Sequence, residues 1–167
     1  MKTRVYIDTN IFVYAIFHDP KFGDICSRIL RDMGSRLFDA YGSILVAIEL
    51  LGSISKIDPT IASNATNLYF QLPHKILNVN LKTLRIASHI TDIVNLRYDS
   101  IHLALMIENS VDRIITNDKD DWYRAKNNFK KIKEKLEKEG FKIEINNINI
   151  ITPEEYRLFE ETLHKRA

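Results

Sequence analysis

Four widely spaced acidic residues, each beside an apolar segment, have the clearest capacity for chemistry in this chain. Asp8 and Asp118 each follow a short apolar segment that is typical of a β-strand. Glu49 and Asp99 lie in longer apolar segments with helical character. Carboxylates are seldom buried unless they are paired or bind a metal ion. Because open α/β folds bind ligands at the carboxyl ends of their strands, we expect the four acids to converge there on a divalent cation.

The chemistry of such a site would be phosphodiester cleavage. Mg²⁺ and Mn²⁺ prefer oxygen ligands, so several carboxylates would hold one ion or two, in part through water. The metal would lower the pKa of a bound water, which then acts as the nucleophile, and would stabilise charge on a phosphoryl oxygen. Two ions about 3.5–4 Å apart would contact both the attacking and the leaving oxygen.

Each acid also has a simpler structural explanation. Asp8 and Asp99 could stabilise helix N-termini, where the helix dipole favours negative charge, and Asp118 could lie in a solvated turn. Glu49 is harder to explain in this way. Its helical neighbours are apolar, and no Lys or Arg lies three or four residues away to pair with it. One shared metal site explains all four acids together.

Composition predicts one soluble domain. The chain has 167 residues, of which 45% are hydrophobic and 28% charged, with a net charge of +2. This mildly basic balance permits nucleic-acid binding without requiring it. The single cysteine, Cys26, excludes an intramolecular disulfide and a cysteine-rich zinc site. With no apolar segment of signal-peptide or membrane-span length, we expect a cytoplasmic protein and no membrane partner.

Apolar periodicity and turn residues predict alternating strands and helices. Strands are expected at residues 4–7, 36–40, 75–79 and 112–116, with extended chain at 141–151. Helices are expected at residues 11–16, 21–33, 60–71, 81–95 and 126–139, in segments beginning at 43 and 99, and after Thr152-Pro153. Asn10 is expected to cap the first helix. The pattern predicts an α/β fold with a central, mostly parallel sheet and helices on both faces.

Five segments, in order along nearly the whole chain, together resemble the motifs of PIN-domain nucleases. They are Val5-Tyr6-Ile7-Asp8-Thr9-Asn10, residues 43–50 around Glu49, Tyr98-Asp99-Ser100-Ile101-His102-Leu103-Ala104, Ile114-Ile115-Thr116-Asn117-Asp118, and residues 150–156 around Pro153. No single segment is specific, but the ordered set is. The resemblance implies that residues 1–167 form one three-layer PIN-like domain.

The resemblance also implies a site and an activity. The catalytic, metal-binding acids would be Asp8, Glu49, Asp99 and Asp118, with Mg²⁺ or Mn²⁺ as cofactor. Asn10 and Thr116 would be supporting polar groups, although a helix cap and a strand-end hydroxyl explain them equally well. The implied reaction is endonucleolytic cleavage of single-stranded RNA, leaving a 5′-phosphate. Many small prokaryotic members are VapC-type toxins of toxin–antitoxin pairs, so an antitoxin partner is expected, and also a homodimer formed through early helices.

Two regions depart from the family pattern. Asp120 and Asp121 are candidate additional acids, although the spacing from Thr116 favours Asp118 as the fourth ligand. Residues 126–142 look like a lysine-rich insertion, with seven lysines against three glutamates. Lys126, Lys130 and Lys131 are candidates for RNA contact, whereas a solvated helix face is the simpler interpretation of the segment.

Other residues and functions stay open. His102, one turn after Asp99, could approach the metal site, but a histidine on an apolar helix is more often a packing residue. A phosphatase with Asp8 as nucleophile would want an acid at position 10, where this chain has Asn10. A catalytically silent PIN fold could serve as a binding or scaffolding protein. The sequence does not encode the RNA target, and discrimination of RNA from DNA depends on contacts to the 2′-OH.

Overall fold

The computed structural model describes residues 2–165, and within them five strands form one sheet. The strands are β1 (Arg4–Ile7), β2 (Asp39–Ser43), β3 (Lys75–Leu77), β4 (Arg113–Ile115) and β5 (Asn149–Ile151). Their order across the sheet is β3-β2-β1-β4-β5, and every neighbouring pair is parallel. The prediction of a parallel sheet in an α/β fold is confirmed.

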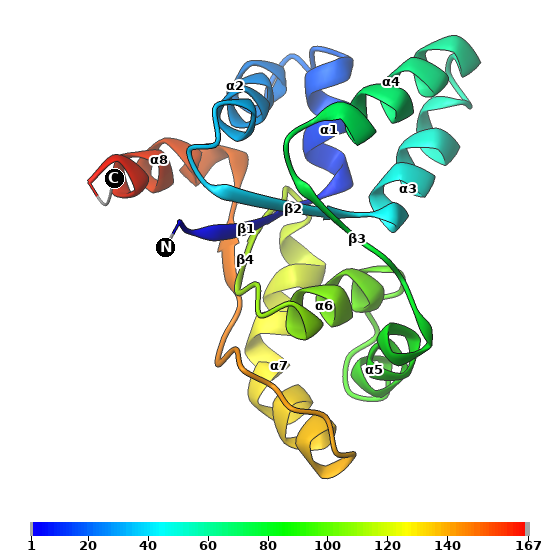
Figure 1. Cartoon of the computed structure of the whole chain (residues 1–167), viewed down its shortest axis with the longest axis vertical. Helices are drawn as coiled ribbons and strands as arrows, with labels where there is room; N and C mark the ends of the chain where they lie inside the picture. Colours follow the sequence, from blue (N-terminus) through cyan, green and yellow to red (C-terminus); the bar gives the residue numbers. More distant parts are fainter. Residues whose placement is uncertain (1, 166–167) are drawn as a thin grey trace.

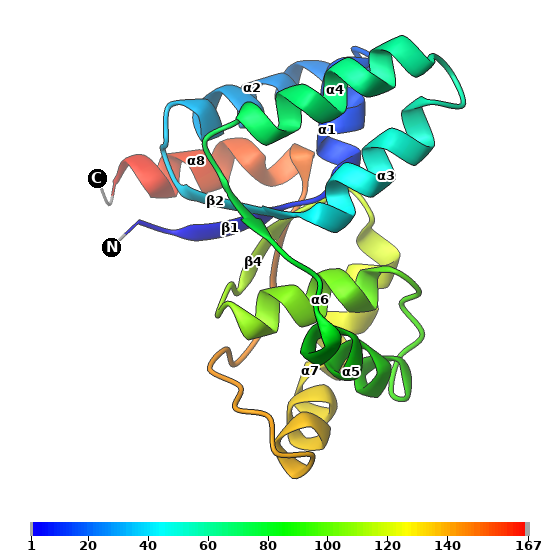
Figure 2. The same ribbon diagram turned by 45° about the vertical axis from the view of Figure 1, so that its right-hand side comes forward.

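Helices cover both faces of the sheet, which confirms the three-layer arrangement (Figures 1 and 2). One face carries α1 (Thr9–Ile16), α2 (Gly23–Gly34), α3 (Ile44–Ile54), α4 (Pro59–Gln71) and α8 (Tyr156–His164). The other face carries α5 (Leu81–Thr91), α6 (Asp99–Glu108) and α7 (Lys119–Lys138). A short 3₁₀ helix, Pro153–Glu155, precedes α8. Across residues 2–165, no helix combines the length and the apolar character needed to cross a bilayer.

The central strand is apolar on both sides, as a parallel sheet between two helical layers requires. Val5, Tyr6 and Ile7 of β1 are each at most 1% exposed. From β1 the chain moves to β2 and β3 on one side and later returns to β4 on the other. The strand order therefore changes direction between β1 and β4, and open α/β sheets bind ligands at the carboxyl ends of the strands at such a point.

Several element boundaries differ from the sequence prediction. β2 begins at Asp39 instead of residue 36, because Arg36 has a φ of +57° and lies in a left-handed turn. The expected extended chain at 141–151 forms a strand only at Asn149–Ile151. Helix α5 ends at Thr91 instead of residue 95.

The largest difference is in α7, which begins at Lys119 instead of residue 126 and is not an exposed helix. Trp122, Phe129, Ile132 and Leu136 recur at helical spacing and are each at most 2% exposed. The polar segment after Asp118 is therefore the first turn of this helix. The lysines of residues 126–138 lie between the buried positions of a helix that packs on the core.

The middle of β2 has room only for glycine. A Cβ at Gly42 would overlap the Tyr69 hydroxyl and come within 3.1 Å of the His74 ring. The Tyr69 side chain is buried, and its Oη donates to the Ser43 carbonyl at 2.9 Å. We therefore expect Gly42→Ala to displace Tyr69 and to lower the free energy of unfolding by about 2 kcal/mol, as measured by urea denaturation.

Gly52→Ala is the matched control for this prediction. Gly52 lies in α3, and no atom lies within 4 Å of the Cβ it would gain. Because Ala is a better helix former than Gly, this variant should be more stable than the wild type by up to about 1 kcal/mol. If Gly42→Ala unfolds at the same urea concentration as the wild type, the packing described for Tyr69 is wrong.

Candidate metal centre

The sheet holds Asp8 and Thr116 together. The register pairs Ile7 of β1 with Ile115 of β4, and the Asp8 N–H extends this ladder by donating to the Ile115 carbonyl at 3.1 Å. Asp8 and Thr116 are therefore neighbours at the carboxyl ends of the two strands. Thr116 Oγ1 donates to Asp8 Oδ2 at 2.5 Å. Both residues are buried, Asp8 with 5% of its surface exposed.

Asn10 is the second support of Asp8. Its Nδ2 donates to Asp8 Oδ2 at 2.7 Å and to Thr116 Oγ1 at 3.1 Å. Its Oδ1 accepts the Asn117 N–H at 3.1 Å, which ties the turn before Asp118 to α1. The expected capping role of Asn10 is wrong, because α1 begins at Thr9 and Asp8 is its cap, accepting the Thr9 N–H at 2.7 Å.

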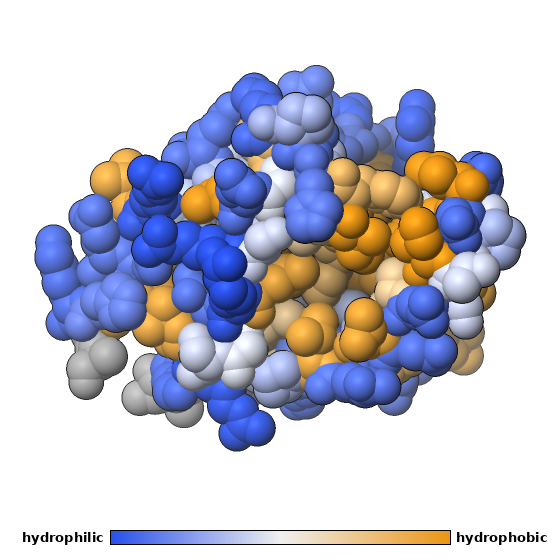
Figure 3. Space-filling view, turned by 90° about the horizontal axis from the view of Figure 1, so that it is seen from above, coloured by the Kyte–Doolittle hydropathy of each residue, from blue (hydrophilic) through white to orange (hydrophobic). Residues whose placement is uncertain are grey.

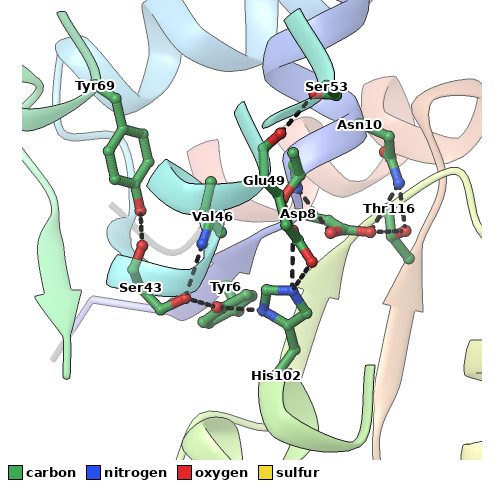
Figure 4. A network of polar contacts seen from close by, with 11 residues as sticks. Tyr6, Asp8, Asn10, Ser43, Val46, Glu49, Ser53, Tyr69, His102 and Thr116 are labelled. Atoms are coloured by element: carbon green, nitrogen blue, oxygen red, sulfur yellow. Dashed lines mark hydrogen bonds and ion pairs between the residues drawn. The ribbon is translucent and has the colours of Figure 1, made fainter. Parts of the chain in front are cut away.

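Glu49 reaches the same end of the sheet from α3. Ser43, the last residue of β2, caps α3 by accepting the Val46 N–H at 3.3 Å. The Glu49 carboxylate accepts a hydrogen bond from Thr9 Oγ1 and lies 3.2 Å and 3.3 Å from His102 Nε2 of α6 (Figure 4). Its side chain is 28% exposed. Glu49 therefore stands at the rim of the core with the partner that its local sequence could not supply.

His102 connects Glu49 to a buried tyrosine. The imidazole is fully buried, and its Nδ1 lies 2.7 Å from the Tyr6 hydroxyl, which donates to Ser43 Oγ at 2.7 Å (Figure 4). Both ring nitrogens of His102 thus face oxygen atoms of the protein. The orientation of the Glu49 carboxylate is set by a chain of contacts that begins in β2.

The electrostatics favour a charged pair between His102 and Glu49. Burial disfavours the imidazolium, but the hydrogen bond to Glu49 and the nearby charges of Asp8, Glu49 and Asp99 raise the pKa of His102. Burial likewise disfavours the Glu49 carboxylate, but hydrogen bonds from His102 and Thr9 lower its pKa. The ion pair holds a charged carboxylate beside Asp8.

A second group of acids lies next to the first. Asp99 of α6, Asp118 before α7 and Asp121 in the first turn of α7 have carboxylate oxygens within 4.8 Å of one another. Asp8, Glu49 and His102 form a group by the same criterion. The charge of Asp8 acts on the Asp99 carboxyl group, so the two groups belong to one site.

Asp99 is held in an environment that opposes its charge. Burial and the negative charges of Asp8, Asp118 and Asp121, against the opposing effect of His102, raise the pKa of Asp99 to about 7. Within residues 2–165 no group donates a hydrogen bond to the Asp99 carboxylate. Burial also raises the pKa of Asp8, despite the charge of His102 and the hydrogen bonds that Asp8 accepts. A bound cation would stabilise both groups as anions.

These residues fit a hard divalent cation. Their donor atoms are carboxylate oxygens, the ligands that Mg²⁺ and Mn²⁺ prefer. The two nitrogens of His102 already contact Tyr6 and Glu49, so the acids are the available ligands. A bound cation would offset the repulsion among the carboxylates and supply the missing partner of Asp99.

The structure separates the remaining candidate residues. Asp121 joins Asp99 and Asp118, whereas Asp120 lines a neighbouring hollow with Lys119. The lysines proposed for RNA contact lie about 7–15 Å further along α7 than Asp121. These lysines are Lys126, Lys130 and Lys131, and their role in RNA binding stays a prediction.

The contact between His102 and Glu49 was not foreseen from the sequence, although the spacing of His102 from Asp99 signals that His102 lies near the acids. His102 follows Asp99 by three residues, so both side chains project from the same face of α6. The packing interpretation is correct as far as burial is concerned. The same residue also hydrogen-bonds a candidate metal ligand, which an apolar helix sequence does not reveal.

His102→Leu should weaken both the fold and the binding of metal. The change leaves the Glu49 carboxylate without its charged donor and leaves the buried Tyr6 hydroxyl with Ser43 as its remaining partner. We expect a loss of about 3 kcal/mol in the free energy of unfolding and of about 10–100-fold in Mn²⁺ affinity, measured by urea denaturation and calorimetric titration.

His89→Leu is the control for this substitution, because His89 lies on α5 with a 26% exposed side chain and faces Asp92, which belongs to neither acid group. It should change Mn²⁺ affinity less than twofold. Unchanged Mn²⁺ affinity in His102→Leu would show that Glu49 does not depend on this contact.

Comparisons with known proteins agree with this geometry. A family model of the PIN domain matches residues 5–128, a range that includes both acid groups. A chain of the structure of VapBC2 from Rickettsia felis bound to a promoter DNA fragment is similar, at 16% identity and a TM-score of 0.59. The DNA-bound VapBC structure from Salmonella typhimurium is similar at 14% identity and a TM-score of 0.58.

Both similarities cover 90% of this chain and 98% of the other, and at these identities they establish the fold. No curated protein sequence matches. The family model spans most of the chain and contains the acids that the fold brings together, so the chain belongs to the PIN domain family.

Proposed function

We propose that the protein is a metal-dependent endoribonuclease that cleaves single-stranded RNA and leaves a 5′-phosphate. The observation that carries this proposal is the convergence of acids from four separate segments at the carboxyl end of β1 and β4. A partly buried, like-charged group of this kind is costly to the fold and is expected where it serves a function. Membership of the PIN domain family supports the same activity.

Asp8, Glu49, Asp99 and Asp118 would hold Mg²⁺ or Mn²⁺, with Asp121 as an additional acid. A bound ion would supply a Lewis acid that lowers the pKa of water and offsets charge on the phosphodiester. Thr116 and Asn10 fix the Asp8 carboxylate from the buried side. Thr9 and His102 fix Glu49 in the same way. The residues behind the acids therefore preorganise the site.

A protein partner is part of this proposal. The two similar structures are VapBC complexes, and we propose an antitoxin as partner of this chain in the cytoplasm, with a homodimer as the functional unit. An exposed apolar patch on α3 and α4 supports a protein partner (Figure 3). It contains Ile48, Leu51, Ile61 and Leu68, which are 60%, 48%, 38% and 60% exposed. Ile48 and Leu51 flank Glu49, so a partner bound there would lie next to the acids.

The substrate is tested with RNA and DNA oligonucleotides of one sequence, each labelled at the 5′ end and incubated with Mn²⁺ or Mg²⁺. We expect internal cleavage of the RNA, with 5′-phosphate and 3′-hydroxyl ends identified by mass spectrometry. Equal cleavage of the DNA would show that the enzyme is not specific for RNA. An inert protein, across several RNAs and both metals, would favour a binding or scaffolding role.

A further inference from the structure

Helices α2 and α8 lie on the face of the sheet that also carries α1 (Figure 2). A groove with basic walls lies between them. Its cavity volume is about 740 Å³. The cationic side chains that line it are Lys21, Arg28, Arg31 and Arg157, and the acids are Asp24 and Glu154. The groove therefore has a local excess of positive charge in a protein whose net charge is only +2.

The sequence of α2 explains why these cations face outward. Cys26, Ile29 and Met33 occupy the buried side of the helix and are fully covered by the core. Arg28 and Arg31 follow the opposite side, one turn apart, and Arg157 of α8 lines the same groove. The core thus fixes the direction in which the arginines project.

The groove is continuous with the acid site. A smaller hollow of about 360 Å³ is lined by Asp118, Asp120 and Lys119, and it shares Lys21, Phe22 and Glu154 with the groove. Phe22 is fixed in place because its ring packs 5.4 Å from the ring of Tyr14, whose hydroxyl accepts a hydrogen bond from Asn117 at 3.1 Å. The hollow beside Asp118 and the groove along α2 are therefore neighbours that share three lining residues.

Two of the arginines are available for an anionic ligand. Lys21 and Lys119 both pair with Glu154, and Arg28 pairs with Glu160 at 2.8 Å. Arg31 and Arg157, in contrast, have no hydrogen-bond or ion-pair partner among residues 2–165. Arg31 lies near the end of α2 that is remote from Phe22, the residue that also lines the hollow beside Asp118. From Phe22 to Arg31 the helix rises about 14 Å, which is the length of about four stacked nucleotides.

We propose that this groove binds the phosphate backbone of single-stranded RNA on one side of the cleaved bond, with Arg31 and Arg157 contacting phosphates. The inference rests on the proposed function for the identity of the substrate. A strand is favoured over a small anion because Arg31 lies about 14 Å along α2 from Phe22, which also lines the hollow beside Asp118. Phosphate contacts of this kind position the chain without reading its sequence.

The test is binding of a fluorescein-labelled, 12-nucleotide single-stranded RNA in EDTA, followed by anisotropy at several salt concentrations. Arg31→Ala/Arg157→Ala should weaken binding at least about 10-fold at low salt. Each lost phosphate contact lowers the slope of log K against log salt by about 0.7 for a single strand, so the slope should fall by about 1.4. Arg31→Lys/Arg157→Lys keeps both charges and should keep most of the slope.

Arg85→Ala/Lys138→Ala is the matched control, because it removes two exposed charges from α5 and α7 on the other face of the sheet. All variants should retain the wild-type melting temperature, which separates lost contacts from lost folding. If Arg31→Ala/Arg157→Ala binds RNA as tightly as the wild type or the control does, the groove is not an RNA-binding site. This conclusion holds whether or not the protein cleaves RNA.

The remaining outcomes separate the groove from the nuclease. If the wild type binds RNA through the arginines but does not cleave it, the RNA-binding role of the groove is supported and the proposed endonuclease activity is wrong. If the wild type binds no RNA at micromolar concentration, the proposed RNA-binding role of the groove is wrong.

Discussion

Asp99→Asn should make the metal-free protein more stable and at the same time remove its activity. The pKa of Asp99 is raised to about 7, so at pH 8 the group is a half-buried anion that opposes folding. Asn keeps the shape and removes the charge. Without metal at pH 8, we expect a gain of about 1–2 kcal/mol in the free energy of unfolding, less than the full shift implies because solvent and neighbouring groups screen the charge.

The same variant loses a proposed metal ligand. Even residues that only support ligands cost 10–100-fold in metal affinity when they are changed, so we expect Mn²⁺ affinity to fall by at least about 100-fold. RNA cleavage should fall to background. Asp120→Asn is the matched control, since Asp120 lies outside both acid groups, and it should change stability by less than about 0.5 kcal/mol. If Asp99→Asn is destabilised without metal, the unpaired state described for this carboxylate is wrong.

The fall in stability with rising pH should become smaller when metal is added. Without metal, Asp99 has a folded-state pKa above its unfolded value, so its contribution to stability is present at low pH and is lost as pH rises through about 7. The raised pKa values of Asp8 and His102 act in the same direction. The lowered pKa of Glu49 matters only in more acidic solution. In EDTA the melting temperature should therefore fall between pH 6 and pH 8.

Metal binding needs ionised carboxylates, so the stabilisation by saturating Mn²⁺ should be larger at pH 8 than at pH 6. Differential scanning fluorimetry at both pH values, with Mn²⁺ or EDTA, measures this directly. Asp99→Asn should flatten much of the pH dependence in EDTA and abolish most of the response to Mn²⁺. A shift by Mn²⁺ that is equal at pH 6 and pH 8 would contradict a site built from Asp99.

Much of the fold follows from the sequence because each strand and most helices are marked locally. Asp8 at the end of β1 and Pro59 in the first turn of α4 are readable signals, and the sheet is parallel as expected. The start of α7 was misplaced because Lys119 and Asp120 resemble a polar turn. Trp122 and Phe129 continue the buried face of the same helix, and this spacing could have corrected the boundary.

The acids of the site could be predicted from the sequence, but the contacts among the site residues could not. Asp121 follows Asp118 by three residues, so helical geometry would have favoured it over Asp120 once α7 was known to begin at Lys119. The pairing of Glu49 with His102 joins two helices that are far apart in sequence, and no local pattern predicts it. Arg31 and Arg157 share a groove for the same kind of reason, because only the packing of α2 against the segment that leads into α8 brings them together.

The most direct test of the metal centre is cleavage of a labelled single-stranded RNA by wild-type protein and Asp8→Asn, each with Mn²⁺ and with Mn²⁺ plus EDTA. Asp8 is the acid that the sheet, Thr116 and Asn10 hold most firmly, so Asp8→Asn should abolish RNA cleavage. We expect cleavage only by the wild type and only without EDTA. Equal cleavage by both proteins, or cleavage that persists in EDTA, would show that the acids at the end of β1 and β4 are not the catalytic site.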